Sequence, residues 1–140
     1  MCYLGMRHRH GEAVPEKISY SGGFGLLEIE RDRFQGLDTE EGFEFSLQGF
    51  DYMGGNMDIE VNADIRSGGY IKGGLVKEGT LEYVKGFGLE DCIPLTGNGT
   101  QLKFQWGGKS KPCYEETRQR VEIRLQLKRC TLFSVSSDCR

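Results

Sequence analysis

A chain of 140 residues has the size of one domain and is long enough to bury a core without a structural metal ion or a disulfide. Its net charge of −3 at pH 7 argues against a nucleic-acid-binding protein, because such proteins usually present a basic surface. No apolar stretch approaches the ~20 residues of a membrane-spanning helix, and residues 1–10 lack the apolar segment of a signal peptide.

The N-terminal part of the chain differs in pattern from the rest. Cys2–Met6 and Gly25–Glu30 are expected to be two strands joined by the long polar loop Arg7–Gly23. A charged link follows the second strand. We therefore predict a hairpin and linker over residues 1–35 and a second domain over residues 36–140.

Three later segments alternate apolar and polar residues, as strands with one buried face do. The alternation covers residues 43–48, 57–64 and 121–128. A last strand, Leu132–Val135, follows a kink near Cys130. These segments predict an antiparallel sheet with one face on a core and the other in water.

Tyr70–Val76 is also expected to be a strand, and its Gly73-Gly74 pair indicates a bulge or a close approach by neighbouring backbone. Thr80–Val84 is a weaker strand candidate, and Glu115–Gln119 could form one helical turn. Turns are predicted where glycine clusters with polar residues, at 54–56, 67–69, 77–79 and 97–99.

The run from Gly86 to Trp106 combines a polar loop, an Asn-Gly turn signal and a strand. In that strand Leu102, Phe104 and Trp106 share one face. This predicts a core position for Trp106, worth on the order of 3 kcal/mol, rather than a role as a platform for sugars. The fold predicted from these patterns is an all-β antiparallel β-sandwich preceded by a short β-hairpin.

Five cysteines, an odd number, leave at least one thiol without a partner inside the chain. Their spacing fits no zinc-binding template. A disulfide among Cys113, Cys130 and Cys139 and free buried thiols both agree with the sequence. The oxidation state of these residues and of Cys92 therefore stays open.

Three segments carry a family pattern. Residues 22–42, GGFGLLEIERDRFQGLDTEEG, hold a glycine-rich strand and an Arg-Asp-x-Phe element that begins at Arg31. Residues 86–108 run from Gly-Phe through an acidic-acidic-Cys triplet and a Thr-Gly turn to a strand ending in Trp. The closing run RVEIRLQLKRCTLFSV alternates basic and apolar residues. In this order the segments resemble glycoside hydrolase-like proteins in which a concanavalin A-like β-sandwich follows a five-bladed β-propeller.

The resemblance implies a concanavalin A-like or jelly-roll sandwich, with residues 1–35 as the remnant of a last propeller blade. It implies a non-catalytic accessory domain that gives structural support or binds carbohydrate weakly, in an extracellular or periplasmic parent protein. The catalytic carboxylates of such enzymes lie in the propeller, so none transfers to this chain. Lys109–Thr117 departs from the family, with Pro112 and Cys113 where a leucine-rich turn is usual.

Two further function classes stay open. The chain could be the C-terminal fragment of an active glycoside hydrolase, or a protein–protein interaction module with an exposed apolar patch. It is either intracellular or a piece of a longer chain. Severed strand edges would favour self-association through residues 1–30. The expected partners are an upstream propeller, a glycan or a second copy, with no cofactor, nucleic acid or membrane.

Candidate carbohydrate-binding residues are those that could line a sugar pocket or offer a flat ring. They are His8, His10, Tyr70, Tyr83 and Tyr114. The two histidines are also compatible with an exposed polar loop, and no third ligand accompanies them to hold a metal ion.

Other polar groups have simpler interpretations. Asn98-Gly99-Thr100 makes Asn98 a candidate glycosylation site if the protein is secreted. Glu90-Asp91 could form a calcium site with Asp38, Asp58 and Asp64, but backbone capping by Asp91 is favoured. The pairs Glu40-Glu41 and Glu115-Glu116 would point to opposite faces of a strand, unlike the convergent carboxylates of a glycosidase. No catalytic residue is therefore assigned.

Overall fold

In the computed structural model of this chain, the described residues are 2–5, 24–47, 57–109 and 121–139. The chain divides into two compact units, Met1–Arg31 and Asp32–Arg140. Every regular element within the described residues is a β-strand, and the strand pairings are antiparallel. The expected all-β, antiparallel class is therefore confirmed.

The first unit contains a two-stranded sheet. β1 (Cys2–Gly5) pairs with β2 (Phe24–Leu27), with Cys2 opposite Leu27. The expected pairing of these two segments is confirmed. The polar loop between them lies outside the described residues.

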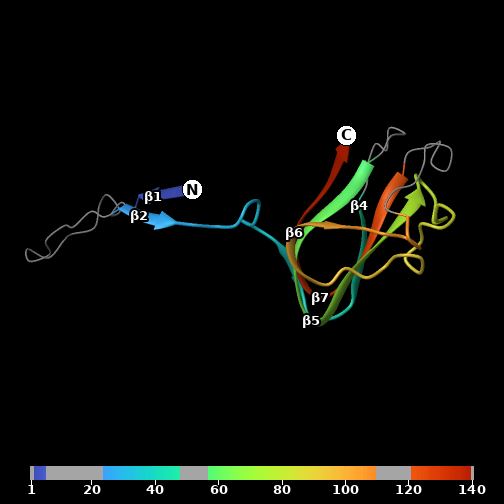
Figure 1. Cartoon of the computed structure of the whole chain (residues 1–140), viewed down its shortest axis with the longest axis horizontal. Helices are drawn as coiled ribbons and strands as arrows, with labels where there is room; N and C mark the ends of the chain where they lie inside the picture. Colours follow the sequence, from blue (N-terminus) through green and yellow to red (C-terminus); the bar gives the residue numbers. More distant parts are fainter. Residues whose placement is uncertain (1, 6–23, 48–56, 110–120, 140) are drawn as a thin grey trace, which may run out of the picture. The chain divides into compact units, whose positions relative to one another are not determined.

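The second unit is built on one five-stranded sheet (Figure 1). Its strands are β3 (Leu37–Thr39), β4 (Phe43–Leu47), β5 (Met57–Lys77), β6 (Gly97–Lys103) and β7 (Val121–Cys139). β7 lies between β5 on one side and both β3 and β4 on the other. β6 pairs with the opposite edge of β5.

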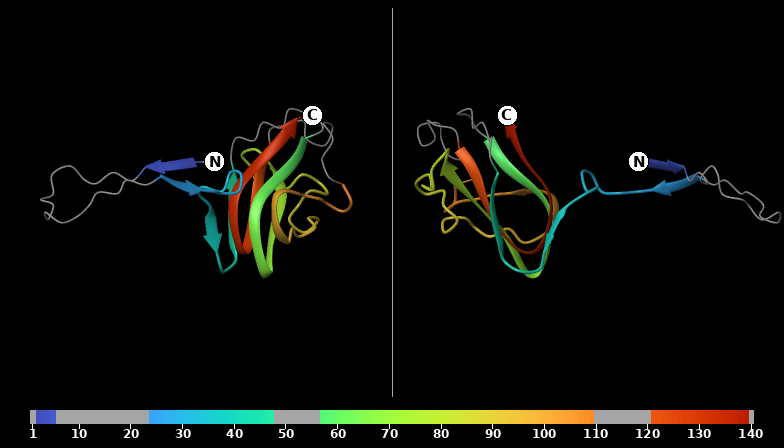
Figure 2. Two further views of the ribbon diagram at one scale, coloured as in Figure 1. Left: turned by 60° about the vertical axis from the view of Figure 1, so that its left-hand side comes forward. Right: turned by 180° about the vertical axis from the view of Figure 1, so that it is seen from behind.

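The long strands β5 and β7 bend together, so the sheet curls into a half-barrel (Figures 1 and 2). We call the two parts of the sheet on either side of the bend its arms: in one, residues 57–65 pair with 130–139, and in the other, residues 70–77 pair with 121–128. Their pairing shifts register between Ile65 and Tyr70. At this level of β7, Arg129 has a φ of 47°, in the left-handed region. Only glycine fits at Gly69, because a Cβ there would lie 2.4 Å from the carbonyl oxygen of Arg129.

Cross-strand pairing explains where the sequence-based expectations succeed and fail. The kink near Cys130 is confirmed, but the turn predicted at 67–69 is wrong, because these residues lie within the continuous strand β5, at the shift in its register with β7. The turn predicted at Asn98-Gly99 is also wrong, since Asn98 pairs with Asp64 inside β6. Thr80–Val84 is not a strand and contributes only an isolated bridge to β5.

Apolar side chains fill part of the space between the arms. The odd-numbered residues of 59–65 in β5 and of 121–127 in β7 are buried, as the predicted alternation requires. An aromatic cluster of Phe87, Phe104 and Trp106 packs against them. Trp106 is 1% exposed, so its predicted core position is confirmed.

Two glycines of β5 allow this cluster to approach the sheet. A Cβ on Gly73 would lie 2.9 Å from the ring of Phe104, and one on Gly74 would lie 2.8 Å from the ring of Tyr83. The carbonyl of Gly73 also accepts a 2.7 Å hydrogen bond from Nε1 of Trp106. The close approach predicted for this pair is confirmed.

Candidate functional site

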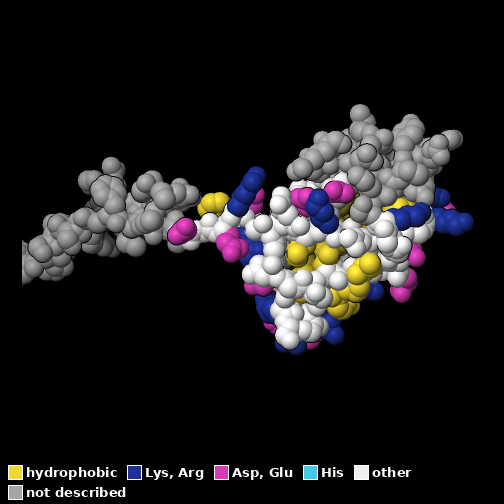
Figure 3. Space-filling model, in the orientation of Figure 1, with side chains coloured by type: hydrophobic (Ala, Val, Ile, Leu, Met, Phe, Trp, Pro, Cys, Tyr) yellow, Lys and Arg dark blue, Asp and Glu magenta, His cyan; other side chains and the backbone are white. Residues whose placement is uncertain are grey.

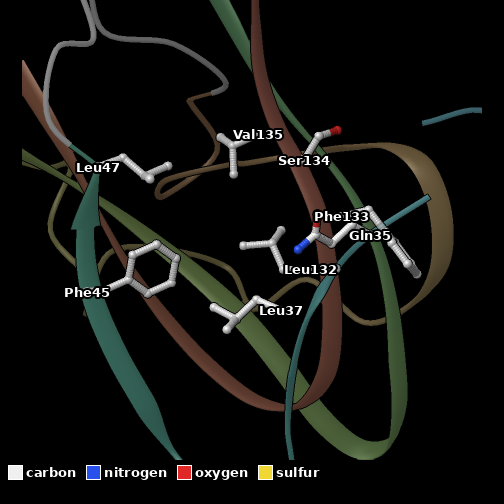
Figure 4. A pocket seen from close by; sticks show the side chains of 9 residues that line it. Gln35, Leu37, Phe45, Leu47, Leu132, Phe133, Ser134 and Val135 are labelled. Atoms are coloured by element: carbon white, nitrogen blue, oxygen red, sulfur yellow. The ribbon is translucent and has the colours of Figure 1, made fainter. Parts of the chain in front are cut away.

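An apolar groove lies beside β3, β4 and the C-terminal part of β7 (Figure 4). Its volume of about 630 Å³ falls within the roughly 300–1,000 Å³ typical of ligand pockets. It is lined by Gln35, Gly36, Leu37, Phe45, Leu47, Leu132, Phe133, Ser134 and Val135. None of these side chains is charged, so the groove suits an apolar occupant.

The groove exists because the bend brings distant parts of the sheet together. Leu37 and Leu132 are paired across β3 and β7 on one arm. Phe45 and Leu47 belong to β4, which pairs with the other arm. Figure 4 shows these four side chains and Val135 pointing toward a common space. Five apolar side chains from two arms therefore form its floor and walls.

The apolar face of β4 is incompletely covered. Phe43 is 46% exposed and stacks on Phe45 with ring centroids 5.5 Å apart. The alternation predicts Phe43 on the core, and this is wrong. Of the three apolar residues on this face of β4, only Phe45 and Leu47 pack against the core. Leu37, at the groove, is 43% exposed. The exposed apolar surface thus extends from the groove along β4.

A second exposed apolar area lies on the face drawn in Figure 3, over the segment between β5 and β6. Ile93 and Leu81 belong to that segment and are 49% and 80% exposed. Neither residue lines the groove. They provide comparison positions for any test of the groove.

The outer edges of β3 and β4 carry no backbone pairing to another described strand. Both strands pair with β7 alone. In an antiparallel pair, alternate residues direct N–H and C=O groups away from the partner strand. The groove is therefore bordered by backbone donors and acceptors as well as by apolar side chains.

Ion pairs hold β3 and the residue that follows it, Glu40, against the bend. Arg66 donates to a carboxylate oxygen of Asp38 and, at 2.7 Å, to Glu40. The hydroxyl of Thr131 donates to Asp38 at 2.5 Å. The hydrogen bonds from Thr131 and then from Arg66 lower the pKa of Asp38. These contacts fix β3 at one end of the groove.

Arg33 fixes the segment that leads into β3. Its Nε donates to Oδ1 of Asn62 at 2.8 Å, and its Nη2 donates to Oδ1 of Asn98 at 2.6 Å. The guanidinium also lies 4.8 Å from the ring centroid of Phe133. That ring approaches Gly36 so closely that a Cβ there would lie 2.9 Å from it. Arg33 thereby positions the wall of the groove formed by residues 35–37.

Of the residues predicted to bind carbohydrate, the structure describes Tyr70 and Tyr83, and these two lie far apart. His8, His10 and Tyr114 lie outside the described residues. Tyr70 follows the bend of β5, whereas Tyr83 bridges to Val76. Six residues of strand separate Tyr70 from Val76, or about 20 Å.

Asn98 is exposed in β6, and its side-chain oxygen accepts the hydrogen bond from Arg33. Asp91 accepts a 3.0 Å hydrogen bond from the backbone N–H of Gly88, so backbone capping by this residue is confirmed. Within the described residues no group of three or more His, Cys, Asp or Glu side chains is arranged to hold a metal ion.

Two cysteines are buried free thiols, Cys92 and Cys130. Burial raises the pKa of both. The sulfur of Cys92 accepts a hydrogen bond from the backbone N–H of Gly73 at 3.3 Å. Both thiols behave as core residues.

Sequence reasoning missed the groove, although the alternation in β4 identified two of its lining residues. The kink of β7 was predicted, but not which segments it brings together, namely Leu132 and Val135 of β7 with Phe45 and Leu47 of β4. No helix within the described residues is long and apolar enough to span a membrane. Comparison with known proteins finds no matching protein-family model, no matching curated protein and no matching solved structure.

Proposed function

We propose that this chain is a non-catalytic interaction module whose binding site is the groove between β3, β4 and β7. The observation that carries the proposal is an uncharged apolar groove of about 630 Å³ beside incompletely covered side chains of β4. Contiguous exposed apolar surface on a soluble domain typically marks a binding site. Of the function classes open from the sequence, this one draws most support from the geometry.

The chemistry of the lining favours binding over catalysis. Among the described residues that line it, the only polar side chains are the amide of Gln35 and the hydroxyl of Ser134. Neither is a general acid or base near neutral pH, and the described part of the lining includes no carboxylate, imidazole or thiol. Such a site can hold and orient an apolar group.

Titration with Nile red, an uncharged apolar dye, tests this proposal. We expect saturable binding that Leu37→Asp reduces at least ~10-fold, because a carboxylate in an apolar site must be desolvated. Leu81→Asp, at an exposed position outside the groove, is the matched control and should bind like the wild type. Equal binding by both variants would remove the groove as the site.

The concanavalin A-like sandwich and the accessory role in a glycoside hydrolase-like protein remain proposals that rest on the family resemblance. The carbohydrate version has its own test. Binding to a glycan array that Tyr70→Ala or Tyr83→Ala abolishes would support it. A blank array would remove it and leave the groove proposal untouched.

A further inference from the structure

We infer that the groove takes an extended strand of a partner protein, apolar and uncharged at alternate positions, which pairs with the outer edge of β4, where no described strand is paired. This inference rests on the proposed function and specifies the occupant. The strand would continue the sheet beyond β4 and place every second side chain in the groove, as in recognition by β-strand addition.

The first argument comes from the backbone of β4. All five residues of β4 pair with β7 on one edge, and no other described strand pairs with its second edge. Edge strands are usually protected by charged side chains, lysine above all, by proline or by a bulge. The one charged residue of β4, Glu44, is paired with Arg124 of β7. β4 has the sequence FEFSL, without lysine or proline, and its register with β7 is regular. As far as the described strands go, its outer edge is therefore available for pairing.

The second argument comes from the side chains. Phe45 and Leu47 project into the groove from alternate positions of β4. A strand paired with β4 projects its own alternate side chains to the same face. Those side chains would meet Leu132 and Val135, and the uncharged lining favours apolar residues there. The alternate side chains of a strand therefore match the two-residue spacing of Phe45 and Leu47 along the groove.

Charge complementarity specifies the other face of the occupant. Residues 34–47 contain four carboxylates and neither lysine nor arginine, and two of the four, Asp38 and Glu40, already pair with Arg66. On the inner edge of β4, Glu44 lies 2.8 Å from Nε of Arg124 in β7, an ion pair without hydrogen-bond geometry. The side chain of Glu44 remains 39% exposed. A partner strand with a basic residue opposite Glu44 would repeat on the outer edge the pattern that β7 presents on the inner one.

The test uses the full chain and the peptide acetyl-KVRVQVK-amide, which alternates basic or polar residues with valine. We expect it to bind and to displace Nile red, and we expect Leu37→Asp, but not Leu81→Asp, to weaken it at least tenfold. Two N-methylated versions decide the binding mode. One carries methyl groups on the valine amides and the other on the amides of the central arginine and glutamine.

Residues of one alternate set direct their amides toward β4, so methylation of that set should abolish binding and methylation of the other should spare it. Equal binding by both versions, with displacement of the dye, would overturn strand pairing and leave the proposed function standing. No binding of dye or peptide would overturn both. A dimer of the chain that the peptide dissociates would show that a second copy occupies the groove, and would also overturn the inference.

Discussion

Trp106 joins the aromatic cluster to the central strands by packing and by one buried hydrogen bond. We expect Trp106→Ala to lower the free energy of unfolding by about 3–5 kcal/mol, through the cavity it leaves and the unpaired carbonyl of Gly73. Urea denaturation measures the loss. Leu81→Ala, at an exposed position, is the control and should change stability by less than about 0.5 kcal/mol. A loss below about 1 kcal/mol for Trp106→Ala would contradict its place in the core.

Gly73 offers a second test at a single residue. The added Cβ of Gly73→Ala would meet the buried ring of Phe104 at 2.9 Å, so we expect a loss of roughly 1–3 kcal/mol. Gly42→Ala is the matched control, because nothing lies within 4 Å of the position that its methyl group would take and no positive φ is involved. Thermal unfolding of both variants distinguishes a steric clash from a general effect of replacing glycine.

Asp38 makes the attachment of β3 sensitive to pH. Its hydrogen bonds with Thr131 and Arg66 lower its folded pKa below the ordinary value of 3.8. A lowered folded pKa stabilises the fold above the unfolded pKa, and this stability is lost as the pH falls through the folded pKa. Asp38→Asn should therefore be less stable than wild type near neutral pH, with a difference that shrinks below pH 3.8. Denaturation across pH checks this, and a constant difference would exclude the ionised carboxylate as the cause.

At the scale of the strands, the alternation in β4, β5 and β7 could be predicted because side chains of period two determine which face is buried. Turn predictions based on short glycine-containing sequences were wrong where those residues belong to a long paired strand. The glycines at 68 and 69 indicate a turn, yet they serve the bend of a continuous strand, and Asn98 lies in β6 rather than in a turn. The groove depends on which distant segments the bend brings together, and no local pattern in the sequence encodes that.

The pair of strands β1 and β2 forms the first unit of the chain. It is a two-stranded sheet, and such sheets are marginally stable unless their edges or faces find partners. We predict self-association through residues 1–30, measured by sedimentation of the full chain against a chain lacking those residues. A monomeric full chain, with this segment protected in hydrogen exchange, would refute the prediction.

For the second unit as a whole, the half-barrel explains both the core and the groove. The aromatic cluster with Trp106 packs against the arms near the centre of β5, while β4 and the C-terminal part of β7 leave an apolar space between them. The core is filled by the aromatic cluster, whereas the groove is lined by apolar side chains and open to solvent. This accounts for the exposed side chains of Leu37 and Phe43.

The central claim is that this unoccupied space is where a partner binds. A chemical-shift titration of the isotope-labelled chain with acetyl-KVRVQVK-amide tests it most directly. The account predicts that the backbone amides with the largest changes cluster in residues 35–37, 43–47 and 132–135. Changes concentrated in residues 78–96, over the other exposed apolar area, or no changes at saturating peptide, would contradict it.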